Sequence, residues 1–255
     1  MLPGLVSVTF RRKTPREILE LMIRAELCAI EWGADVHVPP GDVATAGVVG
    51  EMTRQSGVII ASYGSYHRMG GVDDAFLRVL DSASALGAPV VRVWAGDRPS
   101  AAYTPAQLED FIASARRMGD ACEERGLSLA LEYHGGTLTD TPDAARALFD
   151  RLRHPAILSH WQPPVGLADA DCLDALHRMA PDLAHLHVFS WDAAGQRLPL
   201  SARETLWRQA LSAADIAPDY MSIPRCALLE FVRGDDPDQL IADAHALRSW
   251  LRALR

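Results

Sequence analysis

Four side chains that can bind a metal ion or move a proton stand at or near the ends of four apolar runs in the second half of the chain. They are Glu132 in LSLALE (127–132), His160 in AILSH (156–160), His187 in LAHLHVF (183–189) and Glu230 in CALLEFV (226–232). Carboxylates and neutral imidazoles bind divalent cations, and both also act as general acids and bases. A shared metal or proton-transfer site requires that the four side chains meet.

The alternation of residues within these runs indicates the direction of each side chain, because side chains of a β-strand point alternately to its two faces. In LSLALE the three leucines share one face, whereas Ser128, Ala130 and Glu132 share the other. The leucine face suits a covering helix, and the small residues suit a crowded barrel interior. We therefore expect Glu132 to point inward, and the same alternation turns the other three side chains inward.

Four inward-pointing groups of this kind predict a bound cation. Buried carboxylates and imidazoles that lack partners are costly in a medium of low dielectric constant. Two carboxylates and two neutral imidazoles balance the charge of one divalent ion, and Mn, Co, Zn and Mg are all candidates. The predicted metal ligands are Glu132, His160, His187 and Glu230.

Other polar or aromatic residues are candidates for contact with a substrate. His185 shares the inward face of His187 but lies one layer deeper, so it is either a hydrogen-bonded interior residue or a contact to the substrate from below. Glu31 and Arg92 also point inward, and we expect a buried ion pair between them rather than a catalytic role. Further candidates are Trp94 as an aromatic wall and, on loops where a solvated position is the alternative, His37, His67 and Arg197.

The elements that must position these residues are eight apolar, often β-branched runs that alternate with helical patterns. The predicted strands are residues 5–10, 28–32, 58–62, 89–94, 127–132, 156–160, 183–189 and 226–232. Three helical patterns begin with Thr-Pro, a capping residue followed by a proline in the first turn. Glycines stand where helix C-caps belong, at Gly57, Gly87 and Gly126.

This number of alternating elements predicts an α/β fold, a single-domain (β/α)8 TIM barrel over residues 1–255. The active site of such a barrel lies at the C-terminal ends of its strands. The rival fold is a doubly wound sheet, but the first predicted strand is not followed by a GxGxxG motif.

The composition limits the partners and the compartment. The formal net charge of −8 disfavours nucleic acids and anionic membranes, which need a basic binding face. No apolar run approaches the roughly 20 residues that span a bilayer. In MLPGLVSVTFRRKTP the charges follow the apolar run, which is the reverse of a secretory signal. The four cysteines are far apart and form no CxxC pair, as is typical of reduced core residues, so we expect a cytoplasmic protein.

Five segments carry a resemblance to a known superfamily: IEWGADVH, GAPVVRVWAG, LALEYHGG, HLHVFSW and LLEFVRGDD. Over essentially the whole chain, the sequence resembles the xylose-isomerase-like barrels, and its pattern is closest to the bacterial sugar phosphate isomerase/epimerase group. The resemblance implies one metal ion held by strands five to eight, at Glu132, His160, His187 and Glu230.

The sixth strand departs from the family pattern. There SHWQPP has His160 at the position of an aspartate and Pro163 at the position of a second histidine. We expect Gln162 to supply part of the substrate contact that this exchange removes.

The resemblance implies a metal-dependent isomerase or epimerase acting on a sugar, a sugar phosphate or a keto-sugar. Such an enzyme removes a proton next to a carbonyl through an enediolate that the metal stabilises, with Glu132 and Glu230 as catalytic groups. The alternatives are a metal-dependent dehydratase or lyase acting on a polyol or sugar acid, and a non-enzymatic sugar-binding barrel. A nuclease is disfavoured, because the endonuclease relatives use three zinc ions and more ligands than this sequence offers. The resemblance also implies a small carbohydrate as the partner and a possible homo-oligomer.

Overall fold

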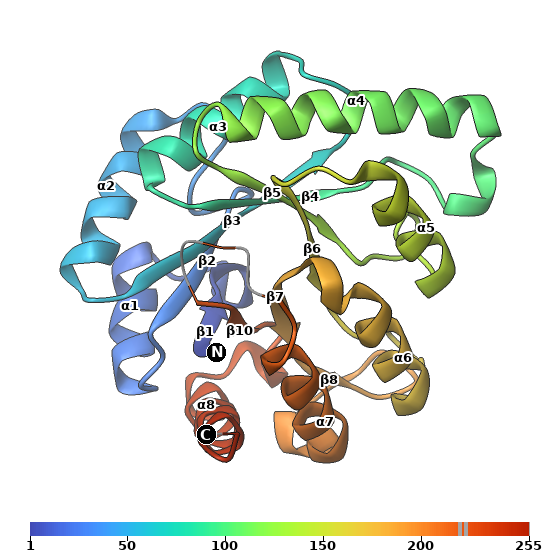
Figure 1. The fold of residues 1–255 in the computed structure, drawn as a ribbon. Helices are drawn as coiled ribbons and strands as arrows, with labels where there is room; N and C mark the ends of the chain where they lie inside the picture. The colour runs from blue at the N-terminus through green and yellow to red at the C-terminus, as the bar shows by residue number, and fades with distance from the viewer. Residues whose placement is uncertain (219–220, 222–223, 255) are drawn as a thin grey trace.

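The apolar runs of the sequence become eight parallel strands that close into a barrel (Figure 1). The structure is a computed structural model and describes residues 1–218, 221 and 224–254. The barrel strands are β1 (Leu2–Val6), β2 (Ala29–Gly33), β3 (Ile59–Arg68), β4 (Val90–Trp94), β5 (Ser128–Glu132), β6 (Ile157–Trp161), β7 (Leu183–Val188) and β10 (Cys226–Leu229). Their order around the barrel is β1-β10-β7-β6-β5-β4-β3-β2, so strands that follow one another along the chain also pair in space.

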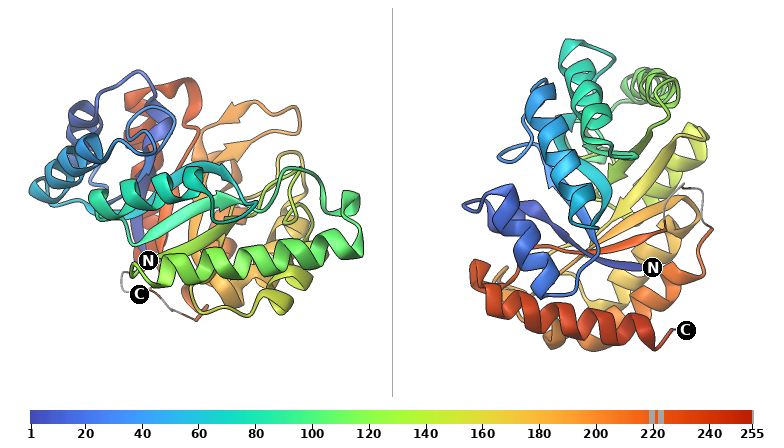
Figure 2. Two further views of the ribbon diagram at one scale, coloured as in Figure 1. Left: turned by 90° about the horizontal axis from the view of Figure 1, so that it is seen from above. Right: turned by 90° about the vertical axis from the view of Figure 1, so that its left-hand side faces the viewer.

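Helices lie on the outside of this barrel (Figures 1 and 2). They are α1 (Pro15–Arg24), α2 (Val43–Gln55), α3 (Asp74–Leu86), α4 (Pro105–Glu123), α5 (Pro142–Leu152), α6 (Asp169–Met179), α7 (Glu204–Asp215) and α8 (Pro237–Arg252). The predicted Thr-Pro starts are confirmed, because Thr14, Thr104 and Thr141 each accept a hydrogen bond from a backbone N–H of the first turn. Gly87 ends α3 in the left-handed conformation, with φ of 81°.

The two faces of each strand pack against different surroundings, as the alternation predicted. Leu129 and Leu131 of β5 belong to the large core between strands and helices. Ala130 belongs instead to a small cluster inside the barrel, with Val90, Leu158 and Ala184 from neighbouring strands. Such an interior layer of side chains is typical of a (β/α)8 barrel. The predicted single-domain barrel is therefore confirmed.

The first strand ends earlier than predicted. β1 stops at Val6, and Ser7–Phe10 form a short 3-10 turn. The hydroxyl oxygen of Ser7 accepts a hydrogen bond from the backbone N–H of Gly33 at 2.8 Å and lies 3.0 Å from Nδ1 of His37. A short polar side chain that bonds the backbone in this way competes with the pairing of strands, so the chain turns here.

Two other differences shape the mouth, meaning the C-terminal ends of the barrel strands. β10 ends at Leu229, so Glu230 lies one residue beyond the strand. Between β7 and α7 the chain adds a hairpin of β8 (Ser190–Trp191) and β9 (Arg197–Leu198), which stands with the loops on the side away from the N-terminus (Figure 2, left). None of the helices in the described part of the chain combines the length and apolarity that crossing a membrane would need.

Candidate active site and metal centre

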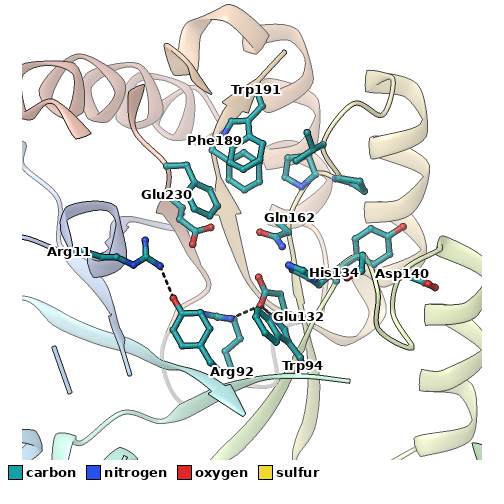
Figure 3. Close-up of a pocket in the computed structure, with 17 residues that line it drawn as sticks. Arg11, Arg92, Trp94, Glu132, His134, Asp140, Gln162, Phe189, Trp191 and Glu230 are labelled. Carbon is teal, nitrogen blue, oxygen red and sulfur yellow. Dashed lines mark hydrogen bonds and ion pairs between the residues drawn. The ribbon is translucent and has the colours of Figure 1, made fainter. Parts of the chain in front are cut away.

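A cavity of about 450 Å³ opens at the mouth (Figure 3), a volume typical of small-molecule sites. Four residues that the sequence predicted for the site line it, namely Trp94, Glu132, Gln162 and Glu230. The other lining residues are Arg11, Tyr66, Arg92, Tyr133, His134, Gly135, Asp140, Pro163, Pro164, Val165, Phe189, Trp191 and Phe231.

Glu132 ends β5 and is held by two donors. Its Oε2 accepts a hydrogen bond from Nε1 of Trp94 at 2.5 Å and forms an ion pair with Arg92. The other oxygen, Oε1, lies 3.8 Å from Nδ1 of His187. Charge-assisted bonds of this kind fix the orientation of a carboxylate. One oxygen of Glu132 is therefore held at the wall of the mouth, and the other faces its centre.

Arg92 links two carboxylates. The predicted ion pair with Glu31 is confirmed, with 2.9 Å between Nε of Arg92 and Oε1 of Glu31, and both side chains are buried. Burial opposes the charge of Glu31, but Arg92 and the histidines His187 and His160 together outweigh burial and hold the pKa of this carboxyl well below its usual value. Burial likewise opposes the charge of Arg92, yet Glu132 and Glu31 raise its pKa. The contact with Glu132 makes Arg92 part of the site, which the sequence did not indicate.

His187 lies completely buried among three carboxylates. Its Nδ1 is 3.2 Å from Oε2 of Glu230, and its Nε2 is 3.3 Å from Oε1 of Glu31. Neither nitrogen has a hydrogen bond of good geometry to a described residue. Burial disfavours the imidazolium, but the charges of Glu230 and Glu31 outweigh burial and raise the pKa of His187 to about 10. Without a cation at the mouth, this histidine holds a proton.

His160 lies beside His187, with 4.1 Å between the ring centroids, and is not exposed to solvent. Neither of its ring nitrogens bonds to a described residue. Burial, together with the neighbouring His187, holds the pKa of His160 well below its usual value. A neutral imidazole with a free lone pair is the form of histidine that binds metal ions.

The buried atoms that lack partners gather at one place, and their chemistry fits a divalent cation. Donor atoms of Glu31, His160 and His187 all lie within 4.8 Å of one another, and Oε2 of Glu230 is also buried without a hydrogen bond to a described residue. Buried polar atoms normally have partners. The three carboxylates at the mouth, together with Arg92, carry a charge of −2 that a divalent cation would balance.

His160 and His187 belong both to the predicted ligand set and to this cluster. The carboxylate of the cluster is Glu31, whereas the predicted carboxylate ligands are Glu132 and Glu230. The oxygens of Glu31 already accept hydrogen bonds from Arg92 at 2.9 Å and from the hydroxyl of Ser62 at 2.6 Å. Oε2 of Glu230 accepts none from the described residues. Glu230 is therefore the better carboxylate donor, and the predicted set of four ligands stays a prediction.

His185, one layer below His187, has partners for both nitrogens. Nδ1 accepts a hydrogen bond from the backbone N–H of Cys226 at 3.1 Å, which leaves Nε2 to donate to the carbonyl oxygen of Ala61 at 3.2 Å. Burial lowers its pKa to about 4. Of the two alternatives left open by the sequence, these contacts match the hydrogen-bonded interior histidine, and His185 does not line the cavity.

The three loop residues predicted to contact the substrate also lie outside the lining of this cavity. His37 is buried, with Nε2 3.1 Å from the carbonyl oxygen of Lys13. His67 packs against Phe76, with 5.3 Å between the ring centroids. Arg197 forms an ion pair with Asp235 on the rim. Direct contact of these three residues with a substrate stays a prediction.

His134 lines the cavity, although it is not among the residues predicted for the site. Its Nδ1 donates a hydrogen bond to the carbonyl oxygen of Gly135 at 2.7 Å, so Nε2 carries the lone pair. The ring lies 5.0 Å from that of Trp94. The signal was present in LALEYHGG, because His134 stands two residues after Glu132 and so has the same parity.

Two further cavity-lining residues that the sequence did not predict, Arg11 and Tyr66, join the loop after β1 to the end of β3. Nη2 of Arg11 donates to the hydroxyl oxygen of Tyr66 at 2.9 Å. Burial raises the pKa of Tyr66 to about 12, so the phenol keeps its proton and can donate a hydrogen bond. No periodic pattern marks this pair, because Arg11 follows the 3-10 turn rather than a strand.

The family model for xylose isomerase-like TIM barrels matches residues 26–216, which is most of the chain. The protein belongs to this family. The family model thus agrees with the resemblance drawn from five short segments, and it covers β2 to α7, which include three of the four predicted ligands.

Sequence identity to individual proteins is low. The chain is 24% identical over 103 residues to the 3-dehydroshikimate dehydratase of Bacillus anthracis, a match that covers 38% of this chain and 35% of that protein. The matched segment thus spans about a third of that relative's length.

Solved structures share the fold. The probable 3-DHS dehydratase of Bacillus anthracis has a TM-score of 0.80 at 16% identity, covering 97% of this chain and 99% of its own. D-psicose 3-epimerase of Clostridium cellulolyticum H10 has a TM-score of 0.69 at 14% identity, covering 100% and 99%. A xylose isomerase-like barrel of Mycobacterium smegmatis, in complex with magnesium, has a TM-score of 0.65 at 18% identity, covering 100% and 98%.

Proposed function

We propose that the protein is a metal-dependent dehydratase: it removes a proton next to a substrate carbonyl and eliminates a neighbouring hydroxyl group as water. The substrate is a polyhydroxy ketone, such as a keto-sugar or sugar acid, of a size that the 450 Å³ cavity holds. The observation that carries the proposal is a difference in hydrogen bonding between two groups that could accept the proton. Nε2 of His134 has no hydrogen-bond partner among the described residues and lies beside the cavity, whereas Glu132 is held by Arg92 and Trp94.

The residues with free donor atoms would hold the metal. His160, His187 and Glu230 would be its ligands, with the free oxygen of Glu132 next to them. When bound, a divalent cation polarises a carbonyl oxygen and stabilises the negative charge that develops on it. Arg92 balances part of the carboxylate charge and keeps Glu132 in place.

In the proposed reaction Nε2 of His134 takes the proton from the carbon next to the carbonyl. The electrons of the broken C–H bond form a C=C bond with the carbonyl carbon. The carbonyl then reforms, the bond between the next carbon and its hydroxyl group breaks, and a C=C bond remains in the product. His134 returns its proton to the departing hydroxyl, which leaves as water, so neither oxidant nor reductant is needed. Tyr66 can donate a hydrogen bond to an oxygen of the substrate while this happens.

The comparisons support a dehydratase without assigning a substrate. The relative from Bacillus anthracis is named as a 3-dehydroshikimate dehydratase, but the match covers about a third of its length. Its reaction therefore supports the class of chemistry proposed here, namely the removal of water from a hydroxylated ketone.

Product analysis tests this proposal. The purified protein, supplied with Mn, Co, Zn or Mg, is incubated with a panel of polyhydroxy ketones and keto acids, and products are read by mass spectrometry and ultraviolet absorbance. We expect an unsaturated product that has lost one water. His134→Gln should lower kcat by about 10²–10⁴-fold at unchanged metal affinity, whereas the exposed His177→Gln should change neither. Wild-type kcat in His134→Gln would contradict the proposed base.

An isomerase or epimerase is the second candidate, and one observation favours it. Glu132 and Glu230 both line the cavity; Glu132 ends β5 and Glu230 directly follows β10, and β6 and β7 lie between these two strands. Two acid–base groups at different places on the wall allow a proton to leave one face of a carbon and return to the other. In that case the product has the mass of the substrate, and Glu132→Gln and Glu230→Gln should both nearly abolish turnover.

A further inference from the structure

Glu31 is a buried carboxylate at the mouth that takes no part in the proposed reaction. It lies completely buried on β2, whereas its neighbour His187 lies on β7. Because β1 and β10 stand between these two strands around the barrel, the contact between Glu31 and His187 crosses the interior. A buried carboxylate is costly unless it has partners, so the partners of Glu31 indicate its role.

The local structure of β2 and β3 is built around Glu31. The register between the two strands shifts between Ile30 and Glu31, and such irregularities re-aim side chains next to active sites. From β3, the hydroxyl of Ser62 donates a hydrogen bond to Oε2 of Glu31 at 2.6 Å. A Cβ at Gly64 would overlap Oε1 of Glu31 and Nη2 of Arg92, so the glycine leaves the space that this ion pair occupies. The carboxylate of Glu31 is therefore held in one position.

His187 presents its two ring nitrogens to different carboxylates. Nδ1 faces two residues that line the cavity, with 3.2 Å to Oε2 of Glu230 and 3.8 Å to Oε1 of Glu132. Nε2 lies 3.3 Å from Oε1 of Glu31, and both oxygens of Glu31 already accept hydrogen bonds from other side chains. The lone pairs of the two nitrogens point away from each other, so one cation binds only one of them. The oxygen that accepts no hydrogen bond from a described residue, Oε2 of Glu230, lies on the Nδ1 side.

We propose that Glu31 is a positioning residue of the metal centre: it accepts the Nε2–H of His187 and so presents Nδ1 to the cation. A metal-bound histidine generally donates its other N–H to a carboxylate or carbonyl, which fixes the tautomer and raises the basicity of the ligating nitrogen. The contact of 3.3 Å is less well aligned than such a bond, and we expect it to tighten when Nδ1 binds a cation. Arg92 joins the same carboxylate to Glu132 (Figure 3), so one buried ion pair orients two sides of the centre. This inference rests on the metal site of the proposed function but not on its reaction.

The tautomer of His187 in the zinc-loaded protein tests this inference. Long-range proton–nitrogen correlation spectra of protein labelled with nitrogen-15 in its histidines distinguish a nitrogen that carries a proton from one that binds a metal. We expect His187 to carry its proton on Nε2 and to bind zinc through Nδ1. His185 serves as an internal reference, because its Nε2–H donates to the carbonyl of Ala61 and its signals should not change when zinc is added. Zinc on Nε2 of His187, the side on which Glu31 lies, would make Glu31 a ligand and overturn the inference.

Zinc affinity, measured by competition with a chelating dye, supplies a second readout. Glu31→Gln keeps the size of the side chain but removes its charge, and it should weaken zinc binding by about 10–100-fold. Ser62→Ala removes a donor to Glu31 and should weaken zinc binding several-fold, which keeps the test open if Glu31→Gln fails to fold. Ser65→Ala is its matched control, because this buried hydroxyl of the same strand donates to the backbone carbonyl of Arg92 instead, and it should leave zinc affinity unchanged.

A purely structural role for Glu31 would give a different result. In that case Glu31→Gln and Ser62→Ala would lower the free energy of unfolding but leave the zinc affinity of the folded protein unchanged, and the inference would be overturned. Neither readout involves turnover. Absence of dehydration on the ketone panel, together with the expected tautomer and the expected losses of affinity, would support this inference and count against the proposed function alone.

Discussion

Two histidines of β7 that share one face have opposite surroundings. His185 has a hydrogen bond at each nitrogen, from the N–H of Cys226 and to the carbonyl of Ala61. His187, two residues closer to the mouth, has no such bond to any residue that the structure describes, and it lies within 3.3 Å of Glu230 and of Glu31. Burial lowers the pKa of the first to about 4, and carboxylates raise that of the second to about 10.

The difference shows what distinguishes a binding group from a structural one in this barrel. Both side chains are fully buried, so burial alone does not separate them. The separating feature is whether the protein itself satisfies the ring nitrogens. In the lower layer the backbone does so, and the interior is complete. At the mouth, the ring nitrogens of His160 and His187 have no hydrogen-bond partner in the described part of the chain, and a bound cation would complete this layer.

Substitution of each histidine in turn should separate the two layers. His187→Ala should weaken manganese binding by more than about 100-fold, because loss even of an outer partner of a ligand costs 10–100-fold. His185→Ala should leave metal affinity within a few-fold of wild type. It should instead lower the free energy of unfolding by about 3 kcal/mol, because two buried backbone groups lose their partner and a cavity forms. Metal titration followed by calorimetry and urea denaturation measure the two quantities.

The reverse result for the two variants would contradict the roles assigned to His185 and His187. If His185→Ala abolished metal binding while His187→Ala only lowered stability, the lower histidine would be the ligand. His177→Gln, on the exposed face of α6, serves as the control in both measurements.

In the metal-free protein, the free energy of unfolding should fall at acid pH because of His185 and at alkaline pH because of His187. These two pH ranges are called the acid limb and the alkaline limb. The pKa of His185 falls from 6.5 to about 4 on folding. Its contribution to the free energy of unfolding is therefore fully present above about pH 6.5 and is lost as the pH falls toward 4. The pKa of His187 rises from 6.5 to about 10, so its contribution is complete below about pH 6.5 and is lost as the pH rises toward 10. Each limb amounts to roughly 3 to 5 kcal/mol, because a tenfold change in an acid dissociation constant corresponds to about 1.4 kcal/mol.

Urea denaturation in the presence of a metal chelator, repeated between pH 4 and pH 10, measures the free energy of unfolding over both limbs. His185→Gln should flatten the acid limb only. Saturating manganese should flatten the alkaline limb, because His187 is then deprotonated in the folded state and in the unfolded state alike. An alkaline limb that persists with manganese bound would mean that His187 is not a ligand.

The sequence predicted the barrel and the inward direction of its metal-capable residues, because alternation along a strand is a local property. It did not predict the contact between Arg92 and Glu132. That contact depends on the register of β4 and β5, in which Trp94 pairs with Glu132 and Arg92 with Ala130. Register between strands is set by the whole closed barrel, and a single strand does not carry it.

The loops were the least predictable part of the site. Arg11 reaches Tyr66 only because β1 ends at Val6 and a 3-10 turn follows, while β3 continues to Arg68. Those boundaries follow from hydrogen bonds between side chains and backbone, such as those of Ser7, which periodicity does not show. His134 was the exception, because its parity with Glu132 could be read from the sequence.

The mouth also differs from the lower layer in backbone strain, and this gives the smallest expected effect. Phe231 has φ of 51°, whereas neither His185 nor any other residue of β7 has a positive φ. Phe231→Gly and Phe231→Ala remove the same ring, but only glycine adopts a left-handed conformation freely. The glycine variant should therefore be more stable than the alanine variant by about 1 kcal/mol, as measured by urea denaturation. Equal stability of the two variants would show that the backbone at Phe231 relaxes once the ring is gone.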